Sequence, residues 1–96
     1  IGGFRMIDGN QSDDKIIAVL LNDAVYGVYK DVTDLPALIL DRLKHYFLTY
    51  KDLPGRARDV EITHTFGCEE AHEIIERSME DYRGRFENLE SVLREV

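Results

Sequence analysis

The chain has 96 residues, a formal net charge of −7 and a single cysteine. This length supports one small domain, and the acidic balance argues against a protein that binds nucleic acid, which requires a basic face. No apolar run approaches the length of a membrane span, so no membrane association is expected. One cysteine cannot form an internal disulfide, which favours a cytoplasmic location.

The first third of the chain predicts two strands followed by irregular structure. Residues 4–7 alternate in polarity and predict a short strand that ends at Asp8. Residues 15–21 are nearly all aliphatic and predict a strand that is buried on both faces. Residues 22–30 contain turn signals, including Gly27, and predict no regular element.

A helix is predicted to follow. It opens at residues 34–36, with Pro36 in its first turn and Thr33 or Asp34 as its cap. The Pro54-Gly55 pair stops it. Five apolar residues at helical spacing predict one buried face: Ile39, Leu43, Tyr46, Phe47 and Tyr50.

The last third predicts one strand and one long helix. Alternating residues over 59–66 predict a half-buried strand with Val60, Ile62, His64 and Phe66 on its inner face. From residue 68 onward the chain predicts a single acidic, amphipathic helix. Its apolar residues recur at a 3.5-residue spacing, which is typical of a helix that lies along another helix: Ile75, Met79, Tyr82, Phe86, Leu89, Leu93 and Val96. The alternative is that Gly84 ends or bends the helix.

A polar turn between the first two predicted strands carries the strongest chemical signal. Asp8 and Asp13 are five residues apart and Lys15 follows. The turn can therefore aim two carboxylates at one hard cation, and the ammonium group of Lys15 at the anion that the cation carries. The alternative is an ordinary solvated turn. An EF-hand is excluded, because Asp13 and Val19 occupy the positions that need Gly and Glu.

Four segments together carry a family resemblance. Residues 3–8, 13–19, 31–36 and 45–53 resemble, in order, the C-terminal half of the soluble family I inorganic pyrophosphatases. Weaker similarity extends to about residue 86. The resemblance implies that residues 1–96 form the C-terminal part of a single domain whose N-terminal strands and central metal-binding Asp-Gly-Asp-Pro-x-Asp motif are absent from this chain.

The predicted order begins with strands, continues with an inserted helix and ends with a further strand and a final helix. This order is typical of the α+β class. The resemblance implies its specific form, a partial OB-type five-stranded β-barrel with about three strands present and two flanking helices, the last one long and amphipathic. A sheet that lacks strands has an unpaired edge that seeks a partner.

The resemblance also assigns roles to five residues. It implies that Asp8 and Asp13 hold Mg²⁺, and that Lys15, Tyr50 and Lys51 bind the phosphate groups of the substrate and serve catalysis. From the residues alone, Lys15 could equally be an edge charge that reaches water and Tyr50 a packing residue. Lys51 could be a cation favoured at a helix C-terminus.

The remaining candidates point to structural roles. His45 is expected to pack or to lie at an interface, His64 to be a satisfied core histidine, and His72 to be exposed. Cys68 has no catalytic partner in sight and is expected to be structural. Asp14 is expected to be solvated, or at most to support a neighbouring ligand.

The sequence therefore predicts the C-terminal part of a Mg²⁺-dependent enzyme that hydrolyses inorganic diphosphate to two phosphates through metal-activated water, as the resemblance implies. This chain alone is expected to be inactive, and the protein is expected to be a homo-oligomer. The rival hypothesis is a non-catalytic fragment or interaction domain that assembles through its last helix.

Overall fold

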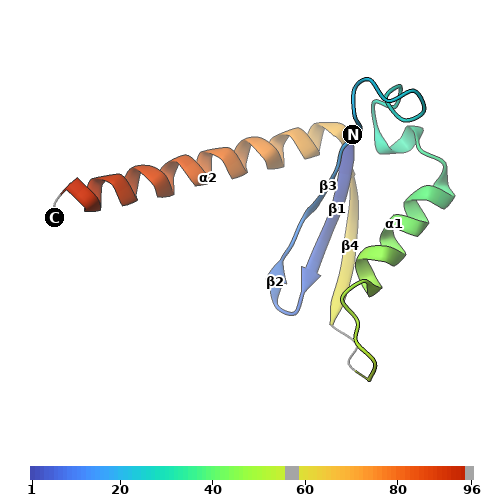
Figure 1. The fold of residues 1–96 in the computed structure, drawn as a ribbon, viewed down its shortest axis with the longest axis horizontal. Coiled ribbons are helices and arrows are strands. Elements are labelled where there is room, and N and C mark those ends of the chain that lie inside the picture. Colours follow the sequence, from blue (N-terminus) through green and yellow to red (C-terminus); the bar gives the residue numbers. More distant parts are fainter. Residues whose placement is uncertain (56–58, 95–96) are drawn as a thin grey trace.

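The computed structural model of the chain describes residues 1–55 and 59–94. It contains an open antiparallel sheet and two α-helices, which confirms the predicted α+β class (Figure 1). The elements in chain order are β1 (Gly2–Asp8), β2 (Gln11–Ser12), β3 (Lys15–Ile17), the 3₁₀ helix η1 (Val32–Asp34), α1 (Ala37–Thr49), β4 (Val60–Gly67) and α2 (Cys68–Arg94).

Strand β1 lies at the centre of the sheet. Its whole length pairs with β4 on one edge, while β2 and β3 pair with opposite ends of its other edge. Between β2 and β3 the backbone N–H of Asp13 donates to the Met6 carbonyl at 2.9 Å, so the chain stays beside β1. The turn after β1 contains Gly9 at φ +64°, a conformation that favours glycine. The sheet thus has four strands where the sequence predicted about three, because β2 was not recognised.

Strand β3 is much shorter than predicted. It ends at Ile17, whose carbonyl accepts a hydrogen bond from the N-terminal amine of Ile1 at 2.8 Å. Beyond this point the chain leaves the sheet, and Leu20 and Leu21 are 78% and 81% exposed. The prediction of a doubly buried strand over residues 15–21 is therefore wrong.

A bulge in β4 divides its side chains between the two faces of the sheet. Arg5 pairs with His64 but Met6 pairs with Ile62, so one extra residue is inserted in β4. Because directly opposed residues share a face, Ile62 lies on the Met6 face and His64 on the Arg5 face. The predicted single inner face is wrong, and so is the core histidine. The His64 side chain is 53% exposed, and its Nε2 lies 3.5 Å from a carboxylate oxygen of Glu70.

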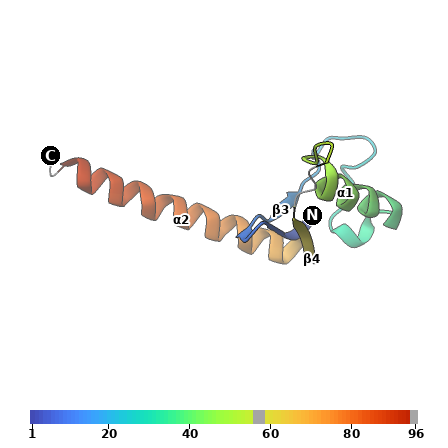
Figure 2. The ribbon, with the colours of Figure 1, turned by 90° about the horizontal axis from the view of Figure 1, so that it is seen from below.

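The two α-helices use opposite faces of the sheet (Figure 2). On the first face, the fully buried Phe4 meets Phe47 of α1 edge-on, with ring centroids 6.2 Å apart. On the second face, Phe66 is buried over Gly3, where an added Cβ would lie 2.6 Å from its ring. Arg5 on this face reaches Glu70 of α2, at 3.8 Å.

Helix α1 begins at Ala37, directly after the segment 34–36 at which it was predicted to open. The carboxylate of Asp31 caps η1 and Asp34 returns a hydrogen bond to the Asp31 backbone, which forms a capping box. Pro36 occupies the N-cap of α1 without a side-chain hydrogen bond. The prediction that Thr33 or Asp34 caps this helix is therefore wrong. The predicted apolar face is only partly covered, because Tyr46 is 54% exposed.

Helix α2 is continuous through Gly84, which confirms the single long helix (Figure 1). Its distal half projects away from the sheet, and the molecule measures 54 × 41 × 21 Å along its principal axes. Val96, the last residue of the predicted apolar stripe, lies outside the described residues. Within the part of the chain that is described, no helix is long and apolar enough to cross a membrane.

Candidate functional site

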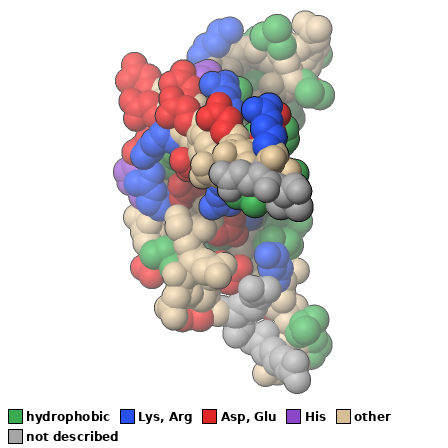
Figure 3. All heavy atoms as spheres, turned by 90° about the vertical axis from the view of Figure 1, so that its left-hand side faces the viewer, with side chains coloured by type: hydrophobic (Ala, Val, Ile, Leu, Met, Phe, Trp, Pro, Cys, Tyr) green, Lys and Arg blue, Asp and Glu red, His purple; other side chains and the backbone are tan. Residues whose placement is uncertain are grey.

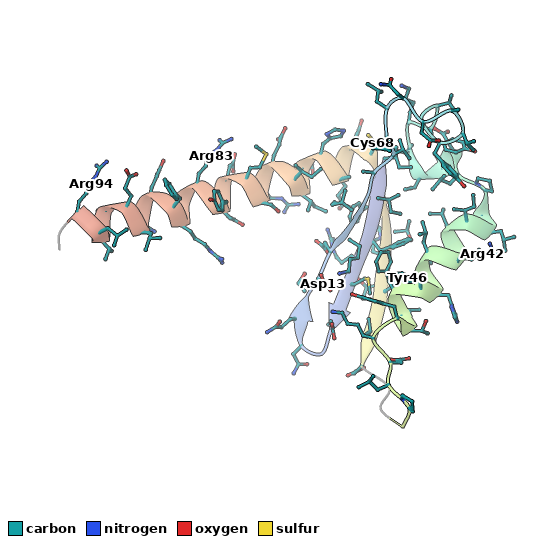
Figure 4. The ribbon with its side chains drawn as sticks, viewed as in Figure 1. Asp13, Arg42, Tyr46, Cys68, Arg83 and Arg94 are labelled. Carbon is teal, nitrogen blue, oxygen red and sulfur yellow. The ribbon has the colours of Figure 1, made fainter. Side chains whose placement is uncertain are left out.

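All five predicted site residues line one pocket at the end of the sheet. Asp8 closes β1, Asp13 precedes β3, Lys15 opens β3, and Tyr50 and Lys51 follow α1. Figure 4 shows Asp13 on the sheet, level with the part of α1 that carries Tyr46. The pocket also includes five residues that the sequence analysis did not assign to the site: Met6, Phe47, Leu48, Asp52 and Val60.

Strand pairing and the end of α1 explain this convergence. Lys15 pairs with Phe4 and therefore lies on the face that α1 covers, with its Nζ 5.7 Å from the centroid of the Phe47 ring. Helix α1 ends at Thr49, so the adjacent Tyr50 and Lys51 are not held on separate faces of a continuing helix. The Lys51 Nζ lies 5.4 Å from the centroid of the Tyr50 ring.

Four of the charged side chains in the pocket form two ion pairs. Lys15 Nζ lies 3.0 Å from Asp13 Oδ2, and Lys51 Nζ lies 3.8 Å from Asp8 Oδ2. The hydrogen bond to Asp13 raises the pKa of Lys15 above its ordinary value of 10.5, against an opposing effect of burial and with help from nearby acidic groups. Lys15 therefore carries its charge throughout the neutral range.

The enclosed space between these side chains is about 10 Å³. That volume accommodates about one water molecule. A diphosphate ion could not be enclosed by the described residues as they stand, so the pocket can provide only one wall of a larger site.

The donor set suits a hard cation but is incomplete. Asp8 and Asp13 offer carboxylate oxygens, and Mg²⁺ is usually bound by one or two carboxylates together with water and substrate phosphates. Among the described residues, no group of three or more His, Cys, Asp or Glu side chains is placed to hold a metal ion. The two aspartates therefore fit as part of a coordination shell.

Asp14 belongs to a different environment from Asp13. Its Oδ1 is buried and lies 3.7 Å from Nε of Arg5, on the face of the sheet that α2 uses. The expectation that Asp14 is solvated is therefore wrong. Asp13 and Asp14 therefore provide a matched pair for substitution experiments, because only Asp13 lies in the pocket with Lys15.

The other candidate residues lie outside the pocket. His45 and His72 are both exposed, as expected for His72. Cys68 is a free, half-buried thiol whose backbone N–H donates to Asp31 at 2.9 Å. The bond from Cys68 is the main reason that the pKa of Asp31 is lowered. The sequence analysis gave Asp31 no role, although its place between a turn and a helix is a typical signal for a cap.

Comparison with known proteins decides the family. The family model for inorganic pyrophosphatase matches residues 1–83. The chain belongs to the inorganic pyrophosphatase family. Three relatives, all inorganic pyrophosphatases of chlamydiae, align over 91 residues and cover 90% of this chain. Those of Chlamydia caviae and Chlamydia muridarum are 44% identical, and that of Chlamydia trachomatis is 43% identical.

The match to these pyrophosphatases is partial on their side. It covers 42% of the Chlamydia caviae protein and 44% of the other two. The chain therefore spans less than half the length of the curated relatives that it matches.

Proposed function

We propose that the protein to which this chain belongs hydrolyses inorganic diphosphate to two phosphates with Mg²⁺ as its cofactor. The observation that carries the proposal is the convergence of five charged or hydroxyl-bearing side chains, from separate segments, on one pocket. Membership of the inorganic pyrophosphatase family supports the same reaction.

In this proposal the two aspartates hold the metal. Asp8 and Asp13 would contribute carboxylate oxygens to Mg²⁺ in exchange for their present ion pairs with lysine. When bound, Mg²⁺ supplies positive charge for the phosphoryl oxygens and makes water a better nucleophile at neutral pH.

The other three residues bind the anion. The ammonium groups of Lys15 and Lys51 would move from carboxylate to phosphoryl oxygens, and the Tyr50 hydroxyl would donate a further hydrogen bond. Charge that develops on the leaving phosphate is then neutralised by groups that are already positioned. The roles of all five residues are part of the proposal.

We also propose that residues 1–96 are the C-terminal part of a single domain, whose remaining strands complete a five-stranded OB-type barrel. A groove of about 1080 Å³ lies between the segment that follows β1 and α2, where its lining residues run from Ile74 to Arg85. The part of this groove that is lined by Ile16, Ile74 and Ile75 would be filled by the rest of the domain. A cytoplasmic location, based on the single free Cys68, completes the proposal.

Removing the charge of Lys15 tests the proposed function. In the full-length protein, Lys15→Met should lower kcat/KM for diphosphate with Mg²⁺ by at least about 100-fold, because a pre-positioned charge in the site is lost. Lys44→Met is the matched control: Lys44 lies over the Phe4 ring, 5.8 Å from its centroid and outside the pocket. Phosphate release measures both variants. Equal rates for the two would contradict the assignment, and absence of hydrolysis by the unmodified full-length protein would reject the proposed reaction.

A further inference from the structure

The distal half of α2 carries an apolar stripe that remains exposed in the part of the chain that the structure describes. Tyr82, Phe86, Leu89 and Leu93, here called the distal stripe, are 54% to 70% exposed. They continue the 3.5-residue spacing of Ile75 and Met79 along one face of a helix that is described up to Arg94.

Most of the distal stripe lies beyond the family match. The family match ends at residue 83, so three of its four members lie beyond the matched region. The helix carries them away from the sheet and from α1 in both views (Figures 1 and 2). Seen from the end where α2 projects, the molecule presents interspersed acidic and basic side chains (Figure 3), so the distal stripe is an apolar feature in charged surroundings.

We propose that two copies of this chain pair through their distal stripes as an antiparallel two-helix coil. A 3.5-residue apolar repeat is the pattern by which one helix packs along another. A second copy is the partner whose surface is complementary under two-fold symmetry. This contact is independent of the proposed reaction.

Charge complementarity selects this partner and this orientation. In this register Phe86 faces the partner's Leu89, and Tyr82 faces the partner's Leu93. Heptad geometry then places Arg83 opposite the partner's Glu90, once on each side of the two-fold axis. Arg83 and Arg94 point to the same side of α2 (Figure 4), and Arg94 donates to Glu90 at 2.9 Å. Arg83 and Glu90 therefore flank the distal stripe on one side.

The direction of the stripe also favours the antiparallel pairing. Ile75, Met79 and Tyr82 line the groove against the sheet, so the sheet lies on the side of α2 that the stripe faces. A parallel pair would bring two sheets to the same end of the coil, whereas an antiparallel pair sends them to opposite ends.

The area is sufficient for a weak, specific contact. Each half-exposed side chain contributes on the order of 100 Å² of surface. Pairing Met79, the distal stripe and Val92 from both helices would therefore bury roughly 1,200 Å², the lower end for a stable interface.

A charge introduced into the distal stripe tests the contact. In the full-length protein, Leu89→Glu should weaken association at least about tenfold in sedimentation equilibrium, because it would bury an unpaired carboxylate. Ser91→Glu adds the same charge on the opposite side of α2 and should leave association unchanged. Loss of association only in Leu89→Glu supports the contact. Equal association of Leu89→Glu and the unmodified protein, or a monomer up to about 100 μM of unmodified protein, overturns it.

A charge swap tests the orientation. Arg83→Glu and Glu90→Arg should each weaken association, by about tenfold, because each places like charges together twice. The double variant should restore association, since the opposite charges meet again. In a parallel pair Glu90 would face the partner's Arg85 instead, and the double variant would stay weak, which would overturn the antiparallel register. Circular dichroism checks that each variant keeps its helix content.

Discussion

Replacing Asp13 by Asn in the full-length protein should lower kcat for diphosphate hydrolysis by at least about 1000-fold, and Asp8→Asn should have a similar effect. Asn keeps the size and turn-forming capacity of Asp but lacks the charge that a hard cation requires. Loss of a metal that stabilises transition-state charge costs several kcal/mol, which corresponds to about three orders of magnitude in rate. Phosphate release at saturating Mg²⁺ measures the change.

The neighbouring carboxylate is the control for this experiment. Asp14→Asn removes a charge one residue away from Asp13, but its carboxylate pairs with Arg5 on the other face of the sheet, at 3.7 Å. Asp14 lies outside the pocket of the proposed site, so its substitution should leave the rate within about threefold. A damaging Asp14→Asn together with a harmless Asp13→Asn would mean that the wrong aspartate has been assigned to the metal.

The isolated 96-residue chain should turn over diphosphate more slowly than about 1 s⁻¹, the low end of ordinary enzyme rates. Asp8 and Asp13 supply only part of a coordination shell, and no set of three candidate ligands occurs among residues 1–55 and 59–94. The pocket encloses only about 10 Å³, which leaves the substrate open to water on the other sides.

A phosphate-release assay with Mg²⁺ on the isolated chain measures this, with the full-length protein as the positive control. Turnover by the chain at a rate comparable with that of the full-length protein would show that the described residues suffice. The proposal that the rest of the domain completes the site would then be wrong.

The fold was predictable where a local sequence pattern determines an element, and it was not predictable where the pairing between strands determines it. The helical periodicity of residues 68–94 was strong enough to predict α2 through Gly84. The bulge in β4 left no mark in its alternating sequence, so His64 was assigned to the wrong face. Strand β3 ends at Ile17 although the residues that follow are also aliphatic, so the aliphatic run carries no information about where strand pairing stops.

The site could be proposed because its residues occur in blocks that resemble one family, and the structure brings the five together in one pocket. Spacing along the chain placed Asp8, Asp13 and Lys15 around one turn. No local pattern could show that Tyr50 and Lys51 meet this turn, because the contact depends on how α1 packs over Phe4. The ion pair of Lys51 with Asp8 and the placement of Asp14 beside Arg5 are likewise products of tertiary packing.

The most direct test of the central claim is a crystal structure of the full-length protein with Mg²⁺ and phosphate. We expect Mg²⁺ at about 2.1 Å from carboxylate oxygens of Asp8 and Asp13. Phosphate oxygens should accept hydrogen bonds from Lys15, Tyr50 and Lys51. Metal and phosphate bound elsewhere, with the two lysine–aspartate pairs of this pocket still intact, would contradict the account.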